Sequence, residues 1–296
     1  MYKLFVGAFL VASLVACTAT GDAEDMGTGT PINNGGHAVN TSSGAHVDGS
    51  SSSASESGDS TDLSKFVEMV EIPALIFSRG TVEYKVNAFS IGKFEVRQGL
   101  YAEIMGDLPK EDVLGLLYPI FNVSWYDAAR FCNALSKRAG LDTAYVYDSV
   151  NNSGELMNLS VNYKAAAVRL PTETEWEIAA RAGTSTTYYW DTDVASKYAY
   201  YAQDKGPVAV GAYTSNALNL YDMAGNVAEW VNDWYDAYPT VSQENYTGPA
   251  EGVYKGVRGG GWSDKVAALA SGERNKKEPK YRSQTIGFRI VYSAGF

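Results

Sequence analysis

Hydrophobic and polar residues alternate in two short stretches early in the aromatic-rich part of the chain. The stretches are 82–86 and 88–91, where the apolar side chains fall on every second position. Because successive side chains of a β-strand point to opposite faces, this period predicts two half-buried strands. Long stretches of any regular period are scarce elsewhere, which indicates a fold with little regular secondary structure.

A helical period begins at Ser124, which is a good N-cap with Asp127 three residues later. One apolar stripe then runs as far as Gly140, where the pattern ends. The stripe consists of Trp125, Ala128, Cys132 and Leu135. The sequence therefore predicts a helix that buries Cys132 as a structural thiol. A catalytic thiol would need a base nearby, and this face of the helix is apolar.

A second helix is predicted between Pro171 and Gly183. Thr172 and Glu175 have the spacing of a capping box, and the apolar residues of the next two turns face inward. The first turns are acidic, at Glu173, Glu175 and Glu177. The helix dipole accounts for acids at this end, so we expect capping rather than acid–base catalysis. Strands and helices of this kind together predict an α+β fold.

Composition and charge exclude several classes of function. The 296 residues are 45% hydrophobic and 12% aromatic, which suffices for a core, and the formal net charge is −10. No basic field is present to bind nucleic acid. The two histidines, His37 and His46, lie in a polar, low-complexity stretch, where they are polar linker residues or a weak metal site. The remaining chain contains no histidine for triads or zinc sites.

The first 17 residues have the pattern of a secretion signal. A short positive start precedes an apolar run of twelve residues, too short to span a bilayer, which ends at Cys17. Small residues before this cysteine resemble a bacterial lipoprotein signal, so residues 1–17 are predicted to end at a lipidated Cys17 that anchors the protein to the membrane. The alternative is an ordinary secretory signal. Thr18, which is not acidic, favours the outer membrane.

Residues 18–62 have the composition of a disordered tether. They are rich in glycine, serine and threonine, contain seven acidic residues, and lack phenylalanine, tyrosine, tryptophan, lysine and arginine. Such a segment buries too little apolar surface to offset the entropy of ordering. Residues 63–296 are predicted to form one domain, with 27 acidic and 23 basic residues.

Six motifs follow one another in this domain. They are Phe89–Val96, Asn122–Ala128, Arg169–Glu177, Asn219–Trp230, Arg258–Trp262 and Ile286–Arg289. The series resembles the formylglycine-generating enzyme, or sulfatase-modifying factor, family over roughly residues 66–292. The resemblance implies an α+β fold related to C-type lectins and poor in regular secondary structure. Enzymes of the family oxidise a sulfatase cysteine with a copper ion held by two cysteines.

The sequence departs from the family at the copper site. Alignment from the Gly259–Trp262 motif places Asp264 and Leu269 at the positions of the two cysteines. A cuprous ion prefers thiolate ligands, which these side chains do not offer. We therefore expect no copper and a domain without the oxidase activity. The iron-dependent sulfoxide synthases that share the domain need a histidine triad, which is also missing.

The resemblance also implies one structural calcium ion. In family members the loop that matches Gly225–Trp230 binds calcium, which transfers the ligand role to Asn226, Val227 and Glu229. The alternative is that Asn226 and Glu229 only form hydrogen bonds within the loop.

A binding function is the main hypothesis from the sequence. The segment between Trp262 and Ile286 is polar and charged, and it occupies the place where the family's enzymes accept a peptide. The candidate ligand-binding residues are Trp230, Arg258, Trp262, Asp264, Arg274 and Arg282. The expected ligand is a protein or a glycan. Two alternatives are a ligand-binding lipoprotein diversified by a retroelement and a structural scaffold of an envelope or secretion machine.

Overall fold

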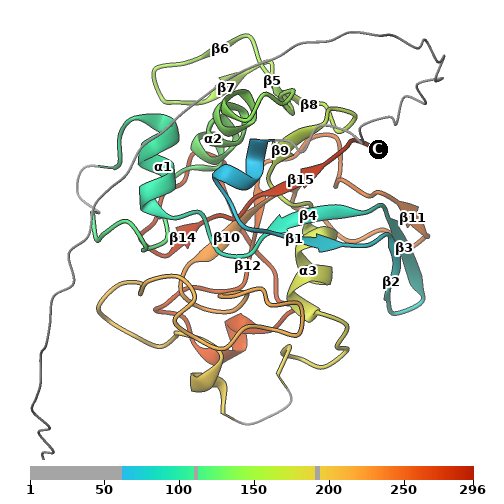
Figure 1. Ribbon diagram of the computed structural model, residues 1–296. Helices are drawn as coiled ribbons and strands as arrows, with labels where there is room; N and C mark the ends of the chain where they lie inside the picture. Colours follow the sequence, from blue (N-terminus) through green and yellow to red (C-terminus); the bar gives the residue numbers. More distant parts are fainter. Residues whose placement is uncertain (1–61, 110–112, 191–193) are drawn as a thin grey trace, which may run out of the picture. The chain divides into compact units, whose positions relative to one another are not determined.

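Four short strands form the first sheet of the computed structural model, which describes residues 62–109, 113–190 and 194–296 (Figure 1). Their order is β1 (Met69–Ile72), β4 (Phe89–Gly92), β15 (Val291–Ser293) and β9 (Ala167–Arg169). All three pairings are antiparallel. The last strand of the chain thus lies between strands from the first and middle thirds, which closes the domain.

The second sheet carries the residues that matter most below. Its order is β13 (Asn275–Lys277), β12 (Lys255–Arg258), β10 (Ala228–Trp234) and β14 (Ile286–Gly287). β10 pairs antiparallel with β12 and parallel with β14. Glu229 of β10 is therefore opposite Arg258 on one side and Gly287 on the other.

The remaining strands form small ribbons. A three-stranded sheet has the order β11 (Gln243–Glu244), β3 (Val82–Val86), β2 (Leu75–Arg79). Two further pairs are β5 (Tyr145–Val146) with β8 (Ser160–Val161), and β6 (Ser149–Val150) with β7 (Leu156–Met157). Single turns of 3-10 helix occur at Asp62–Lys65, Ala195–Lys197 and Val266–Leu269. The two strands predicted from alternation are confirmed as β3 and β4.

Three helices complete the described domain: α1 (Gln98–Met105), α2 (Trp125–Arg138) and α3 (Glu173–Arg181). Both predicted capping boxes are present, Ser124 with Asp127 on α2 and Thr172 with Glu175 on α3. α2 packs against α1 and β9, whereas α3 packs against β10 and β12. Short strands, few helices and long connections confirm the predicted α+β class.

Cys132 lies in the core, as predicted. It is fully buried among the apolar residues that α2 turns toward the first sheet, and burial raises the pKa of its thiol. Trp125, Trp176 and Trp230 are likewise fully buried. Cys132 is therefore a packing residue in this fold and not a reactive thiol.

The predictions for the N-terminal part lie outside the described residues. These are the signal with its lipidated Cys17, the tether at 18–62 apart from Asp62, and the two histidines. Across 62–109, 113–190 and 194–296, no helix is both long enough and apolar enough to cross a bilayer.

Candidate functional site

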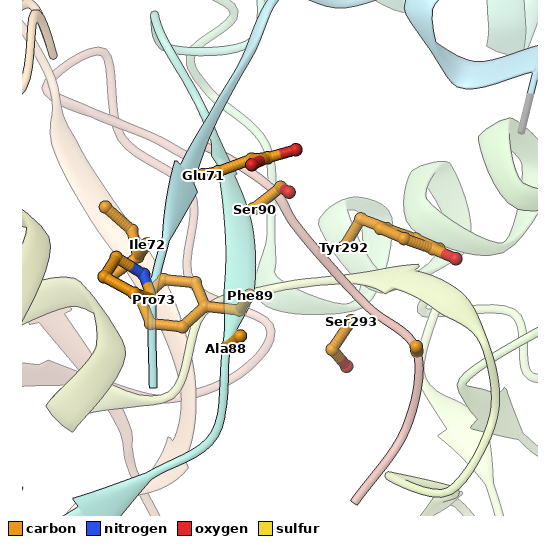
Figure 2. Close-up of a pocket in the computed structure, with 9 residues that line it drawn as sticks. Glu71, Ile72, Pro73, Ala88, Phe89, Ser90, Tyr292 and Ser293 are labelled. Carbon is orange, nitrogen blue, oxygen red and sulfur yellow. The ribbon is translucent and has the colours of Figure 1, made fainter. Parts of the chain in front are cut away.

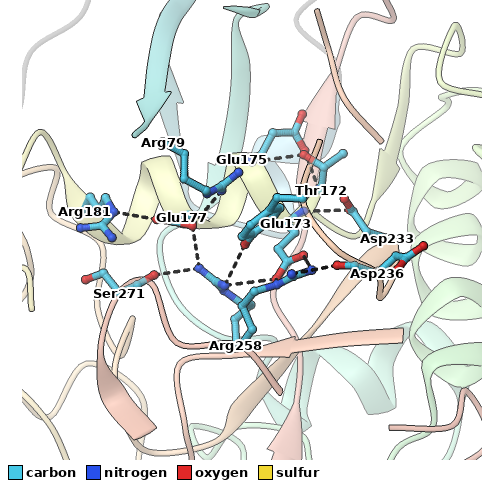
Figure 3. A network of polar contacts seen from close by, with 12 residues as sticks. Arg79, Thr172, Glu173, Glu175, Glu177, Arg181, Asp233, Asp236, Arg258 and Ser271 are labelled. Carbon is cyan, nitrogen blue, oxygen red and sulfur yellow. Dashed lines mark hydrogen bonds and ion pairs between the residues drawn. The ribbon is translucent and has the colours of Figure 1, made fainter. Parts of the chain in front are cut away.

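The acidic residues of α3 bind arginines from the helix itself, from β9 just before it and from distant parts of the chain (Figure 3). Glu175 closes the capping box by accepting the Thr172 N–H at 2.7 Å, and it also pairs with Arg169 through two contacts of 2.7 Å. Arg169 is the residue that ends β9, so this pair fixes the start of α3 against the first sheet. Both side chains are buried.

Glu173 and Glu177 together meet four guanidinium groups. Arg258 reaches both, at 3.1 Å from Glu173 and 3.0 Å from Glu177. The other three arginines each pair with one of these acids: Arg274 with Glu173 at 2.7 Å, and Arg79 and Arg181 with Glu177 at 2.8 Å each. We call these six residues the α3 network. Its positive charges outnumber its negative ones.

The α3 network holds the Glu177 carboxylate in the ionised form. Burial by itself raises the pKa of Glu177, but Arg258 and Arg79 outweigh burial, and the pKa lies below its ordinary value. An ionised carboxylate held by several guanidinium groups is not a proton donor at neutral pH. The structural role predicted for these acids is therefore supported, but the physical cause is ion pairing across the fold as well as the helix dipole.

A second group of buried charges surrounds Glu229 on β10. Both carboxylate oxygens of Glu229 accept from Arg289, at 2.7 to 2.9 Å, and one also accepts from the indole N–H of Trp176 at 2.6 Å. Arg289 also donates to the backbone carbonyls of Gly92 and Tyr221. Glu229 and Arg289 are completely buried, so the pair joins both sheets to the loop before β10.

Glu95 closes that loop from the other side. Its carboxylate accepts from the Asn226 side-chain amide at 2.6 Å and from the Val227 backbone N–H at 3.0 Å. Gly225 has a φ of +81°, and a Cβ there would lie 2.4 Å from the Tyr200 carbonyl oxygen. Only glycine therefore fits the turn that brings Asn226 to Glu95.

Negative charge is in excess in this second group. Glu95, Asp222 and Glu229 share the single Arg289, and we call these four residues the β10 network. Burial, reinforced by Asp222 and Glu229, raises the pKa of Glu95 well above its ordinary value. Burial also raises the pKa of Asp222 to about 6, although the carboxylate accepts the Gly211 N–H at 2.7 Å.

The sequence profile of the sulfatase-modifying factor enzyme 1-like domain family matches residues 64–294. The chain belongs to this family. The motifs of the sequence thus coincide with the structural networks: the α3 acids lie in one motif, Glu229 in another, and Arg289 ends the last one.

The similar proteins include a chaperone, an enzyme and a variable protein. The chain is 30% identical over 234 residues to the chaperone protein LppX of Paenibacillus barcinonensis, covering 69% of this chain and 80% of that protein. It is 26% identical over 194 residues to mouse formylglycine-generating enzyme, covering 59% of this chain and only 44% of the enzyme. Among solved structures, Treponema denticola variable protein 1 matches with a TM-score of 0.69 at 30% identity, over 76% of this chain and 94% of that chain.

The residues at the family's copper positions do not fit copper. Asp264 accepts the Gly261 N–H at 2.8 Å and so closes a turn. Leu269 is buried in the apolar core near α3. One hard oxygen donor and one hydrocarbon side chain cannot replace two thiolates for a cuprous ion. Cys132 belongs to a different core cluster from Leu269.

The charge of the β10 network favours a calcium ion, whereas the hydrogen bonds of its side chains do not. The excess of buried carboxylates in the β10 network would favour a divalent cation. However, Arg289 and Trp176 already bind both oxygens of Glu229, and the Asn226 side-chain oxygen accepts the Val208 N–H at 3.0 Å. In this arrangement Glu229 does not fit as a ligand. Calcium stays a prediction, and hydrogen bonding by Asn226, Val227 and Glu229 is the arrangement observed.

Two of the six predicted ligand-binding residues are in the core, which is a correction. Trp230 is fully buried and donates its indole N–H to the Val123 carbonyl, and Arg258 is held inside the α3 network. Neither can touch a ligand without unfolding. Arg274 is only slightly exposed because Glu173 holds its guanidinium. The polar sequence around these arginines suggests that they are exposed. Ion pairs with the acids of α3 bury them instead.

The other three predicted residues remain accessible in part. Trp262 is half-buried and donates its indole N–H to the Gln284 carbonyl, which ties the loop after β12 to the segment before β14. Asp264 lies in the same loop, also half-buried. Arg282 is exposed and pairs with Asp127 at the start of α2. All three residues lie within the segment that connects β12 to β14.

Lys255 is a buried cation that the sequence analysis missed. Its Nζ lies 4.1 Å from the Trp125 ring centroid and 3.8 Å from that of Trp234, and it donates to the Asn232 carbonyl. Burial lowers the pKa of Lys255 to about 7, and burial raises the pKa of neighbouring Asp233 to about 8. Since the two tryptophans lie far apart in sequence, no local signal marks the site.

A surface cavity of about 370 Å³ lies where β1, β4 and β15 meet (Figure 2). Its lining is Glu71, Ile72, Pro73, Ala88, Phe89, Ser90, Tyr292, Ser293 and Ala294. Glu71 is its only acidic group, and no cysteine or basic residue faces it. The cavity therefore lacks the pairs of groups that acid–base or nucleophilic catalysis requires.

Proposed function

We propose that this protein is a lipid-anchored envelope protein that binds a protein or glycan through its C-terminal face and has no oxidase activity. The observation that carries the proposal is the replacement of both metal-binding thiols by Asp264 and Leu269 in an otherwise complete family domain. The two charge networks keep the scaffold rigid. A rigid scaffold with a polar, irregular segment at its surface is typical of a binding protein.

Two relatives support a binding role, whereas others such as mouse formylglycine-generating enzyme are named as enzymes. One is named as a chaperone, and one solved structure is named as a variable protein. Chaperones bind other proteins, a role that needs no oxidase chemistry. The retroelement-diversified lipoprotein and the envelope scaffold remain alternatives within this proposal, because both use the same domain without oxidase chemistry.

Site-specific photo-crosslinking tests the binding role. A photoreactive residue at Ser263, which is exposed next to Trp262, should give a discrete adduct in intact cells. The same residue at exposed Lys137, in the last turn of α2, is the matched control and should give none. Arg282→Ala should reduce the adduct from Ser263. Equal crosslinking from both positions would show that the C-terminal face is not selective.

The lipid anchor has its own test. The full chain should partition into the detergent phase of a phase-separating detergent, and Cys17→Ala should move it to the aqueous phase. Three acyl chains bury many methylene groups, at about 0.8 kcal/mol each, so the difference should be nearly complete. If both forms partition equally, Cys17 is not acylated. Fractionation of the wild-type protein between inner and outer membranes then tests the outer-membrane proposal.

A further inference from the structure

A row of alternating cations and tyrosines leads from the α3 network to the surface. Arg79 lies 3.7 Å from the Tyr238 ring centroid, and Arg274 lies 3.8 Å from the same ring. Arg274 is also 4.3 Å from the Tyr235 centroid. Lys276 then lies 4.8 Å from Tyr235 and 5.1 Å from Tyr254. The cation–tyrosine row therefore consists of Arg79, Tyr238, Arg274, Tyr235, Lys276 and Tyr254.

The two ends of the row differ in exposure and in pairing. Arg79 and Arg274, at the inner end, pair with Glu177 and Glu173 and have side chains only 19% and 15% exposed. At the outer end Lys276 is exposed and Tyr254 is 37% exposed. Among the described residues, no carboxylate lies within ion-pair distance of Lys276. The outer end thus presents a cation and tyrosine rings to solvent.

Strand geometry explains how the row is built. Arg274 directly precedes β13 and Lys276 is the second residue of the strand, so their side chains, two positions apart, point to the same side. Tyr235 follows β10 and Tyr254 precedes β12, and Tyr235 donates its backbone N–H to the Tyr254 carbonyl at 2.8 Å. The inner ion pair fixes Arg274 and therefore fixes the spacing of the rings beside Lys276.

The charge of this segment favours an anionic ligand. Residues 274–282 contain five basic residues and one acidic residue, in a domain where acidic residues are in the majority. Arg274, Lys280 and Arg282 pair with acids, which leaves Lys276 and Lys277 without an ion pair among the described residues. A local positive surface on a negatively charged domain attracts anions selectively, because the remaining surface repels them.

The edge of β13 disfavours a peptide that adds as a strand. β13 is the edge strand of its sheet, but the Lys276 backbone N–H is already bound by the Asn275 side-chain oxygen at 2.7 Å. Strand addition depends on free main-chain donors at the edge. The side-chain faces beside this edge, flat tyrosine rings next to a cation, offer a ligand the alternative contacts.

We propose that the outer end of the cation–tyrosine row binds an acidic polysaccharide, with sugar rings against Tyr235 and Tyr254 and sugar carboxylates on Lys276. This inference rests on the proposed binding function and names the ligand class of the C-terminal face. The face of a tyrosine ring packs against the C–H groups of a sugar, and the ammonium group of Lys276 forms a charge-assisted hydrogen bond with the sugar carboxylate.

Titration calorimetry of the full chain in detergent micelles tests the proposal, with polygalacturonate as the probe. Lys276→Glu should weaken binding by roughly tenfold or more, and Tyr254→Ala by roughly tenfold. The matched control is Lys197→Glu, because Lys197 also stands over a tyrosine, Tyr198, at 5.4 Å but elsewhere in the fold. This control should leave binding within about twofold. Thermal unfolding of each variant checks that the fold is retained.

Two further polymers separate charge from sugar recognition. Dextran, which is neutral, should not bind, and polyglutamate should bind roughly tenfold more weakly than polygalacturonate. Equal or tighter binding of polyglutamate would overturn the polysaccharide proposal in favour of an acidic peptide. Absence of polygalacturonate binding, or equal loss in the Lys197 control, would also overturn it. The crosslinking experiment at Ser263 does not depend on the calorimetry. The binding function is therefore tested separately from the ligand class.

Discussion

The α3 and β10 networks are both buried in one domain, yet their charge balances are opposite. In the α3 network four arginines surround Glu173 and Glu177. In the β10 network one arginine, Arg289, serves Glu229 directly and lies near Glu95 and Asp222. Burial raises the pKa values of Glu95 and Asp222, and one arginine does not offset it, whereas Arg258 and Arg79 outweigh burial and lower the pKa of Glu177.

This difference in charge balance predicts how strongly the loss of one arginine destabilises each network. A carboxylate with several cationic partners retains some of them when one is removed. A cation that alone faces several carboxylates has no substitute. Removing it leaves buried negative charges together, and their repulsion adds to the cost of desolvation.

Loss of Arg289 should have the largest effect on stability. Arg289→Met should destabilise the protein by about 4 kcal/mol, because Glu229 becomes an unpaired buried charge beside Glu95 and Asp222. Denaturant unfolding of the full chain measures the change. Adding Glu229→Gln to this variant should recover part of the loss, since the unpaired charge is removed. No recovery would mean that packing, and not charge, explains the effect.

Loss of Arg258 should cost less, although it is just as deeply buried. Arg258→Met should destabilise by about 2 kcal/mol, since Arg274 still pairs with Glu173, and Arg79 and Arg181 still pair with Glu177. The same unfolding experiment compares the two variants directly. Equal losses for Arg258→Met and Arg289→Met would contradict the role assigned to charge balance.

Local signals in the sequence predicted local structure well. Both capping boxes lie within four residues of chain, and the two strands follow from alternation within five, so adjacent residues suffice to specify them. The networks were not predictable in this way, because Glu229 and Arg289 are 60 residues apart and Glu95 and Asn226 are 131 apart. For the same reason Arg258 and Trp230 were wrongly expected at the ligand surface: their partners come from distant segments.

Removal of the charge at Asp222 should stabilise the protein. Burial raises the pKa of Asp222 to about 6 in the folded state, so between about pH 4 and 6 folding takes up a proton and stability falls as pH rises. Above pH 6 the ionised carboxylate costs on the order of 2 kcal/mol. Asp222→Asn should therefore be more stable at neutral pH and should flatten this part of the pH profile. Asparagine also tolerates the φ of 56° and can accept the Gly211 N–H.

Thermal unfolding with excess chelator extends this test to calcium. If a cation is bound in the β10 network, Asp222→Asn should lower the stability of the protein and not raise it, because the variant loses a carboxylate that faces the ion. It would also make the wild-type melting temperature fall in chelator and recover with added calcium. An unchanged melting temperature, together with a stabilised Asp222→Asn, leaves hydrogen bonds and Arg289 as the support of the loop.

The smallest effect is expected for the exposed ion pair at the C-terminal face. Arg282 is 42% exposed where it pairs with Asp127, so Arg282→Ala should change the free energy of unfolding by less than about 1 kcal/mol. The capping box of Ser124 and Asp127 remains intact in the variant. A loss as large as that expected for Arg258→Met would show that this pair belongs to the core networks.

The proposal that this chain has no oxidase activity is tested most directly by a search for the aldehyde product. The purified full chain is incubated with copper, a reductant, oxygen and a peptide carrying the sulfatase cysteine motif, beside an active formylglycine-generating enzyme as positive control. Mass spectrometry should detect formylglycine in the control only, because Asp264 and Leu269 supply no thiolate to hold copper. Formylglycine formed by this chain, and still formed by Cys132→Ser, would contradict the loss of the family's chemistry.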